Sequence, residues 1–139
     1  MTVMKKVLIA GFTAGIAVLL VSLGLLYASI FLFPDLVEEY FSPVFRESSR
    51  QTDWLFYVHP FILSFSLKWF WERYKQLFKG IPFVRALELA FVYGIVAMVP
   101  VLWLTFSAID VSLTVTFTWL IYGIIQAFVA GFIFAWLNP

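Results

Sequence analysis

The stretch from Val7 to Phe33 contains no charged side chain, and nearly all of its residues are apolar. An α-helix rises 1.5 Å per residue, so roughly 20 mostly apolar residues cross the hydrocarbon core of a bilayer. The apolar core of a signal peptide has only about 7–15 residues. We therefore interpret this stretch as a membrane helix that is retained, and not as a cleaved leader.

Composition also indicates lipid as the solvent. The chain of 139 residues is 63% hydrophobic and 12% charged, whereas soluble domains are about 45–50% apolar and about 25% charged. A domain of this size cannot hide so much apolar surface in one core.

The same composition excludes several kinds of chemistry. The chain has no cysteine and one histidine, which excludes disulfides, thiolate metal sites and histidine-rich metal centres. It has no phosphate-binding glycine loop and no nucleophile elbow. We therefore expect a protein without enzymatic activity, cofactor, metal site or nucleic-acid partner.

Four apolar segments predict an all-α membrane protein: a single integral membrane domain over residues 1–139, folded as a bundle of four transmembrane helices. The expected spans cover about residues 7–33, 54–78, 83–106 and 111–137. The second is apolar only as far as Phe70 or Trp71, so its last turns should lie at the interface. The first loop has hydrophobic residues at helical spacing, interrupted at Pro43, which predicts a short amphipathic interfacial helix.

The distribution of Lys and Arg predicts the orientation, because cytoplasmic loops are enriched in both. One side of the predicted bundle has only Arg46 and Arg50, among several acidic residues. The other side has six basic residues: Lys5, Lys6, Arg73, Lys75, Lys79 and Arg85. We therefore expect both termini in the cytoplasm and a protein integral to the plasma membrane, the inner membrane of a bacterium.

Small residues recur at four-residue intervals in the last predicted span. Such stripes let membrane helices approach closely. The stripe has two open interpretations: packing inside the bundle, or the interface of a homodimer or of a complex with another membrane protein. Its members are Gly123, Ala127, Gly131 and Ala135.

Polar residues of all four predicted spans fall at one depth, roughly 9 Å from the cytoplasmic edge of a ~30 Å core. They are Thr13, Lys68, Glu88 and Gln126. We expect Lys68 and Glu88 to pair, with Gln126 and Thr13 completing the hydrogen bonds. Two alternatives stay open. Lys68 could extend to the headgroups beside Glu72, four residues later on its own helix, or the layer could bind a ligand, an ion or a proton.

His59 lies about 8 Å from the opposite edge, next to Pro60. A single histidine at this depth is either hydrogen-bonded structure or a proton-responsive group, because its ordinary pKa is about 6.5.

The run "DVSLTVTFTW" from Asp110 alternates polar and apolar residues, which is typical of a strand. A lone strand in lipid would leave its backbone unsatisfied. We therefore predict a helix capped by Asp110, with the Ser and Thr hydroxyls bonding back to their own carbonyls.

Two functional hypotheses follow. The first is a small polytopic membrane protein that binds lipid or a membrane partner. The second is a small homodimeric transporter or channel whose path includes Lys68, Glu88, Gln126 and His59.

Overall fold

A computed structural model describes residues 2–139, and the regular structure within them is entirely helical. The all-α prediction is therefore confirmed. In chain order the elements are α1 (Val3–Leu32), α2 (Pro34–Glu39), α3 (Trp54–Tyr74), α4 (Pro82–Tyr93), the π-helical turn η1 (Gly94–Met98), α5 (Val99–Ala108) and α6 (Leu113–Leu137).

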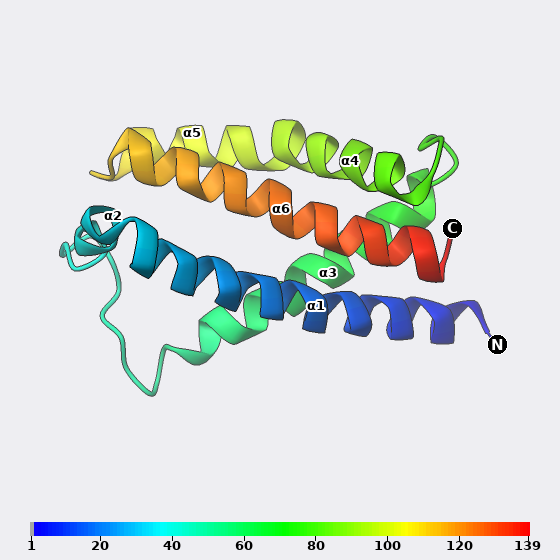
Figure 1. Cartoon of the computed structure of the whole chain (residues 1–139), viewed down its shortest axis with the longest axis horizontal. Helices are drawn as coiled ribbons and strands as arrows, with labels where there is room; N and C mark the ends of the chain where they lie inside the picture. Colours follow the sequence, from blue (N-terminus) through cyan, green and yellow to red (C-terminus); the bar gives the residue numbers. More distant parts are fainter. Residues whose placement is uncertain (1) are drawn as a thin grey trace.

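The helices form an elongated bundle in which α6 is central. Helices α4 and α5 follow each other with η1 between them and lie beside α6, while α1 lies on the other side of α6 and α3 runs obliquely to both (Figure 1). Both ends of the chain lie at the same end of the bundle, which we call the terminal end. The short helix α2 and the α5–α6 turn lie at the opposite end, the loop end (Figure 1).

Three helices are long and apolar enough to cross a membrane: Val3–Leu32, the continuous helix Pro82–Ala108, and Leu113–Leu137. The other predicted span, 54–78, is helical only to Tyr74. Its last turns contain Lys68, Glu72 and Arg73, which shorten its uncharged part. Composition and length therefore support three spans directly.

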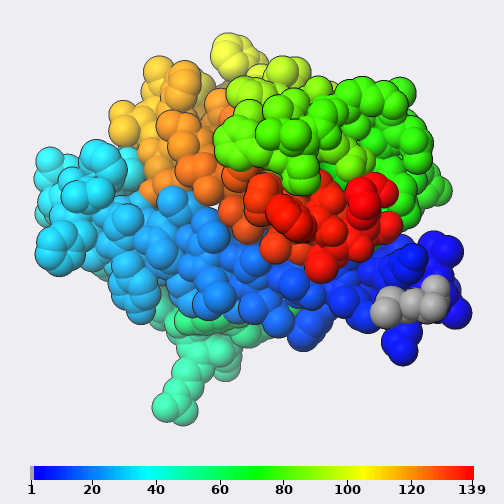
Figure 2. All heavy atoms as spheres, turned by 45° about the vertical axis from the view of Figure 1, so that its right-hand side comes forward, coloured from blue at the N-terminus to red at the C-terminus, as the bar shows by residue number. Residues whose placement is uncertain are grey.

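The small-residue stripe of α6 is buried by the chain's own helices. A Cβ atom at Gly131 would lie 2.9 Å from Leu89 Cδ2 and 3.2 Å from Ala86 Cα, both on α4. One at Gly123 would lie 2.7 Å from Met98 Cε. In Figure 2 the last turns of α6, in red, are wedged between α4 in green and α1 in blue. The stripe therefore packs inside the bundle and is not a free surface for a second copy.

A second close approach joins α1 to α3. Gly11 and Gly15 are buried, and a Cβ at either position would collide with a phenyl ring of α3, Phe65 or Phe61. Glycine at these positions thus lets α3 cross α1 at short range.

The alternating run after Asp110 is helical from Leu113 onward, as predicted, but the N-cap of α6 is a different residue. Ser112, and not Asp110, is the N-cap, and its Oγ accepts from Val115 N at 3.1 Å. Asp110 is two residues too early to reach the free N–H groups of the first turn. The expected back-bonding is present: Thr116 and Thr118 donate to the carbonyls four residues earlier.

Candidate functional site

A cavity of about 640 Å³ lies in the loop-end half of the bundle. It is bounded by α1, α3, α6, η1 and the adjoining turns of α4 and α5, and α2 covers its loop end. Its lining is mostly aliphatic and aromatic. Small-molecule sites have volumes of about 300–1,000 Å³ and a mostly apolar lining with a few polar groups, so this cavity is the candidate site.

The cavity has a local cause. Toward the terminal end, small residues on α1, α4 and α6 let the helices close on one another, and Ala14, Val18, Leu89 and Ala130 have no exposed surface. Toward the loop end, α3 diverges from α6 because of its oblique course (Figure 1). The side chains there do not fill the widening space between the helices.

The floor of the cavity is a hydrogen bond between two helices. Gln126 Nε2 on α6 donates to Ser22 Oγ on α1 at 2.8 Å, and Ser22 donates onward to Val18 O at 2.7 Å. Ser22 lies ten residues from Leu32 at the loop end of α1, a distance of about 15 Å along the helix. Polar atoms are thus present near the middle of α1, deep inside an apolar structure.

The loop end of the cavity is covered by α2 and the residue after it. Leu36 and Val37 are half-buried and line the cavity. Tyr40 accepts a hydrogen bond from Trp119 Nε1 at 2.7 Å, and burial raises the pKa of Tyr40, so its hydroxyl stays protonated.

A carboxylate fixes α2 further. Glu39 accepts from Ser112 N at 3.1 Å and from Ser112 Oγ at 2.8 Å. The short helix predicted in the first loop is therefore present as α2, with its apolar face toward the bundle and its end tied to the start of α6.

The predicted polar layer does not form. Lys68 is fully buried and pairs with Glu72, one turn along its own helix, and not with Glu88. Glu88 is half-buried without a hydrogen bond to any residue of 2–139, and Thr13 faces outward. The Lys68–Glu88 prediction was wrong because α3 and α4 each pack on α6 and make little contact with each other.

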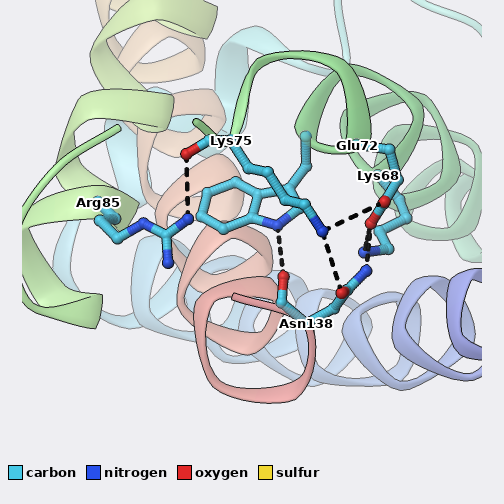
Figure 3. Close-up of polar contacts among 6 residues, drawn as sticks. Lys68, Glu72, Lys75, Arg85 and Asn138 are labelled. Carbon is cyan, nitrogen blue, oxygen red and sulfur yellow. Dashed lines mark hydrogen bonds and ion pairs between the residues drawn. The ribbon is translucent and has the colours of Figure 1, made fainter. Parts of the chain in front are cut away.

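The charges on α3 instead form what we call the terminal polar cluster (Figure 3). Lys68 and the side-chain amide of Asn138 both donate to Glu72 Oε1. Lys75 Nζ lies 3.2 Å from Asn138 Oδ1 and 3.4 Å from Glu72 Oε2. The carboxylate of Glu72 thus holds Lys68 of α3 and Lys75, the C-cap of α3, beside the end of α6.

An aromatic ring joins the cluster to α4. Trp71 Nε1 donates to Asn138 O at 2.8 Å. The guanidinium of Arg85 lies 4.7 Å from the Trp71 ring centroid and donates to Lys75 O at 3.2 Å. The hydrogen bonds and charges of this cluster are mostly used within the chain, so we assign it to holding α3, α4 and α6 together.

Two of the predicted site residues line the cavity: Gln126 at its floor and His59 near its loop end. Lys68, Glu88 and Thr13 do not, so a path through Lys68, Glu88 and Gln126, which the transporter hypothesis needs, is not assembled in this conformation. Sequence analysis missed Ser22, Tyr93 and Tyr122, which also line the cavity. The available signal was two tyrosines well inside apolar spans, where phenol hydroxyls need a partner.

No group of three metal-ligating side chains occurs within residues 2–139. The fold is that of a small, all-helical membrane-embedded protein with a cavity between its helices. No family model matches the chain, and neither a curated protein nor a solved structure matches it.

Proposed function

We propose that this is a small polytopic inner-membrane protein, without enzymatic activity, that binds a lipid-like molecule in the cavity between its helices. The observation behind the proposal is the cavity of about 640 Å³ with its largely apolar lining and its polar floor at Ser22 and Gln126. An apolar space of this size loses packing contacts when it is empty. A molecule from the surrounding lipid that fills it would recover those contacts and stabilise the folded state by mass action.

The proposal includes four membrane crossings with both termini in the cytoplasm. Its structural support is that both ends of the chain lie at the terminal end (Figure 1), which agrees with an even number of crossings. Helix α3 has 21 residues, about 31 Å of helix, which is close to the ~30 Å thickness of the hydrocarbon core. The six basic residues of the predicted cytoplasmic side belong to the terminal end, which agrees with the positive-inside rule.

Single cysteines can test this topology, because the chain contains none of its own. With four spans, Cys at Lys79 or Pro139 should be protected from a membrane-impermeant maleimide in intact cells, and Cys at Arg50 should be labelled. If α3 did not cross, residues 50 and 79 would both lie outside after the first span, and the two later spans would place residue 139 outside as well. Labelling of all three positions would therefore reduce the count to three spans.

Filling the cavity should remove the bound molecule. Ser29 is buried, lines the cavity and donates only to Leu25 O on its own helix, so Ser29→Phe adds a ring without breaking a hydrogen bond between helices. Native mass spectrometry of protein released gently from membranes should show a stoichiometric extra mass on the wild type. The fraction of protein with that mass should fall on the order of tenfold in Ser29→Phe, the equivalent of about 1.4 kcal/mol.

The matched control is Ala28→Phe on the preceding residue, which is exposed and does not line the cavity. It should retain the extra mass. Equal loss in both variants, or a mass unchanged in Ser29→Phe, would contradict binding in this cavity.

A further inference from the structure

The lining of the cavity has an unusual charge pattern. None of the described side chains that line it is Lys, Arg, Asp or Glu. Its polar groups are hydroxyls, one amide, one indole and the imidazole of His59. Since the proposed function places a lipid here, this lining limits which lipids can bind.

An anionic head would find no lysine or arginine inside the cavity. A buried phosphate needs a cation or several charge-assisted hydrogen bonds to offset its lost hydration. The buried cation Lys68 and the half-buried cation Arg85 lie at the terminal end and are engaged in the terminal polar cluster. At the loop end, Arg46 lines a separate hollow together with Glu47 and Asp53.

The polar groups that are available suit an uncharged head. The side chains of Tyr93 and Tyr122 line the cavity, and their hydroxyls make no hydrogen bond within residues 2–139. Each hydroxyl can therefore donate a hydrogen bond to a bound molecule. Gln126 donates through Nε2 to Ser22, which leaves its Oε1 as an acceptor. Carbonyl oxygens match the two phenols, and a hydroxyl matches the amide oxygen.

The depth of these groups supports the same conclusion. Gln126 lies thirteen residues from Leu113 at the loop end of α6, about 20 Å along the helix. A phospholipid keeps its charged head at the bilayer surface, because a charge near the midplane is costly. An uncharged head can move to this depth, where the polar floor replaces its lost hydrogen bonds to water.

We propose that the cavity binds an uncharged lipid whose head has carbonyl or hydroxyl oxygens, in the manner of a quinone or a diacylglycerol. The head lies toward Gln126, Tyr93 and Tyr122, and the hydrocarbon chain lies along the aliphatic wall nearer α2. That wall includes Leu25, Leu26, Ile30 and Leu36.

A competition experiment tests this assignment. Delipidated protein in detergent is incubated with equimolar decylubiquinone, dioleoylglycerol and dioleoylphosphatidylglycerol, separated from free lipid by gel filtration, and its retained lipids are quantified by mass spectrometry. The wild type should retain one of the two uncharged lipids at least tenfold over the phosphatidylglycerol.

Removal of two hydroxyls tests where the head lies. The double variant Tyr93→Phe/Tyr122→Phe should retain severalfold less uncharged lipid, because each lost hydrogen bond is worth about 0.5–1.5 kcal/mol. The matched control is Tyr27→Phe, an exposed tyrosine of α1 that does not line the cavity, and it should behave as wild type. Retention unchanged in the double variant would overturn the placement of the head.

The outcomes separate this inference from the proposed function. If phosphatidylglycerol were retained as well as the uncharged lipids or better, and Ser29→Phe abolished that retention, the preference for an uncharged lipid would be wrong. Lipid binding in the cavity would still be supported. Lipid retention that does not respond to Ser29→Phe at all would overturn both.

Discussion

Replacing Glu72 by Ala should lower the free energy of unfolding by about 3 kcal/mol, because it leaves Lys68 buried without a counter-charge. Lys68 has no exposed surface, and its other close neighbour is the face of the Phe134 ring at 5.3 Å. The carboxylate of Glu72 also accepts from Asn138 and lies near Lys75, so its removal loosens the end of α6. Unfolding by SDS titration in mixed micelles, followed by circular dichroism, measures the change.

Two further variants make this test specific. Lys68→Met combined with Glu72→Ala removes both charges and should recover much of the lost stability, because no buried charge is left unpaired. Glu88→Gln should change the free energy of unfolding by less than about 0.5 kcal/mol, since no residue of 2–139 bonds to Glu88. If Glu88→Gln lowered the free energy of unfolding as much as Glu72→Ala, the result would support a Lys68–Glu88 ion pair, which this structure lacks.

Gly131→Leu should be the most disruptive single change in the helix interfaces, with a cost of about 3 kcal/mol or more. A side chain there meets Ala86 Cα, a backbone atom that cannot rotate aside, as well as Leu89. Helices α4 and α6 must therefore separate to accept it. The same SDS titration applies, and Gly131→Ala should give a smaller loss in the same direction.

Gly24→Leu is the control for this substitution, because a Cβ at Gly24 would meet nothing within 4 Å. It adds the same side chain to a membrane helix on an open face and should leave stability nearly unchanged. Equal costs at Gly24 and Gly131 would mean that the loss reflects glycine replacement in general and not the α4–α6 contact.

The positions of the helices could be predicted because long apolar segments and hydroxyl back-bonding are local properties. The sequence does not show whether the α6 stripe packs inside the bundle or against a second copy, since Gly123 and Gly131 could fit either. In the structure Gly123 packs on Met98 of η1 and Gly131 packs on α4. Lys68 shows the limit of counting depth along a helix: residues at one level can point in different directions, and the ion pair of Lys68 forms with Glu72 on its own helix. Gln126 was recognised as polar and deep, but its partner Ser22 depends on how α1 and α6 are rotated.

The cavity itself could not be predicted from sequence. It arises because α3 crosses α1 obliquely, and that inclination is the sum of many contacts between side chains, including those at Gly11 and Gly15. No local pattern in α3 encodes it. The tyrosines of the lining, Tyr93 and Tyr122, become interpretable only when the space between the helices is known.

The π-helical turn η1 contains one more residue than an α-helical turn at the same place would have. Val99 N donates to Gly94 O, five residues back, and Pro100, which follows directly, has no N–H to offer an ordinary helix. Each residue of an α-helix advances the direction of its side chain by about 100°. The extra residue therefore changes the direction in which every later side chain points. Gly94, the first residue of η1, faces α6, and Leu102 in α5 lines the cavity. Residues 94–98 thus rotate the side chains of α5 relative to those of α4, and Leu102 of α5 lines the same cavity as Tyr93 of α4.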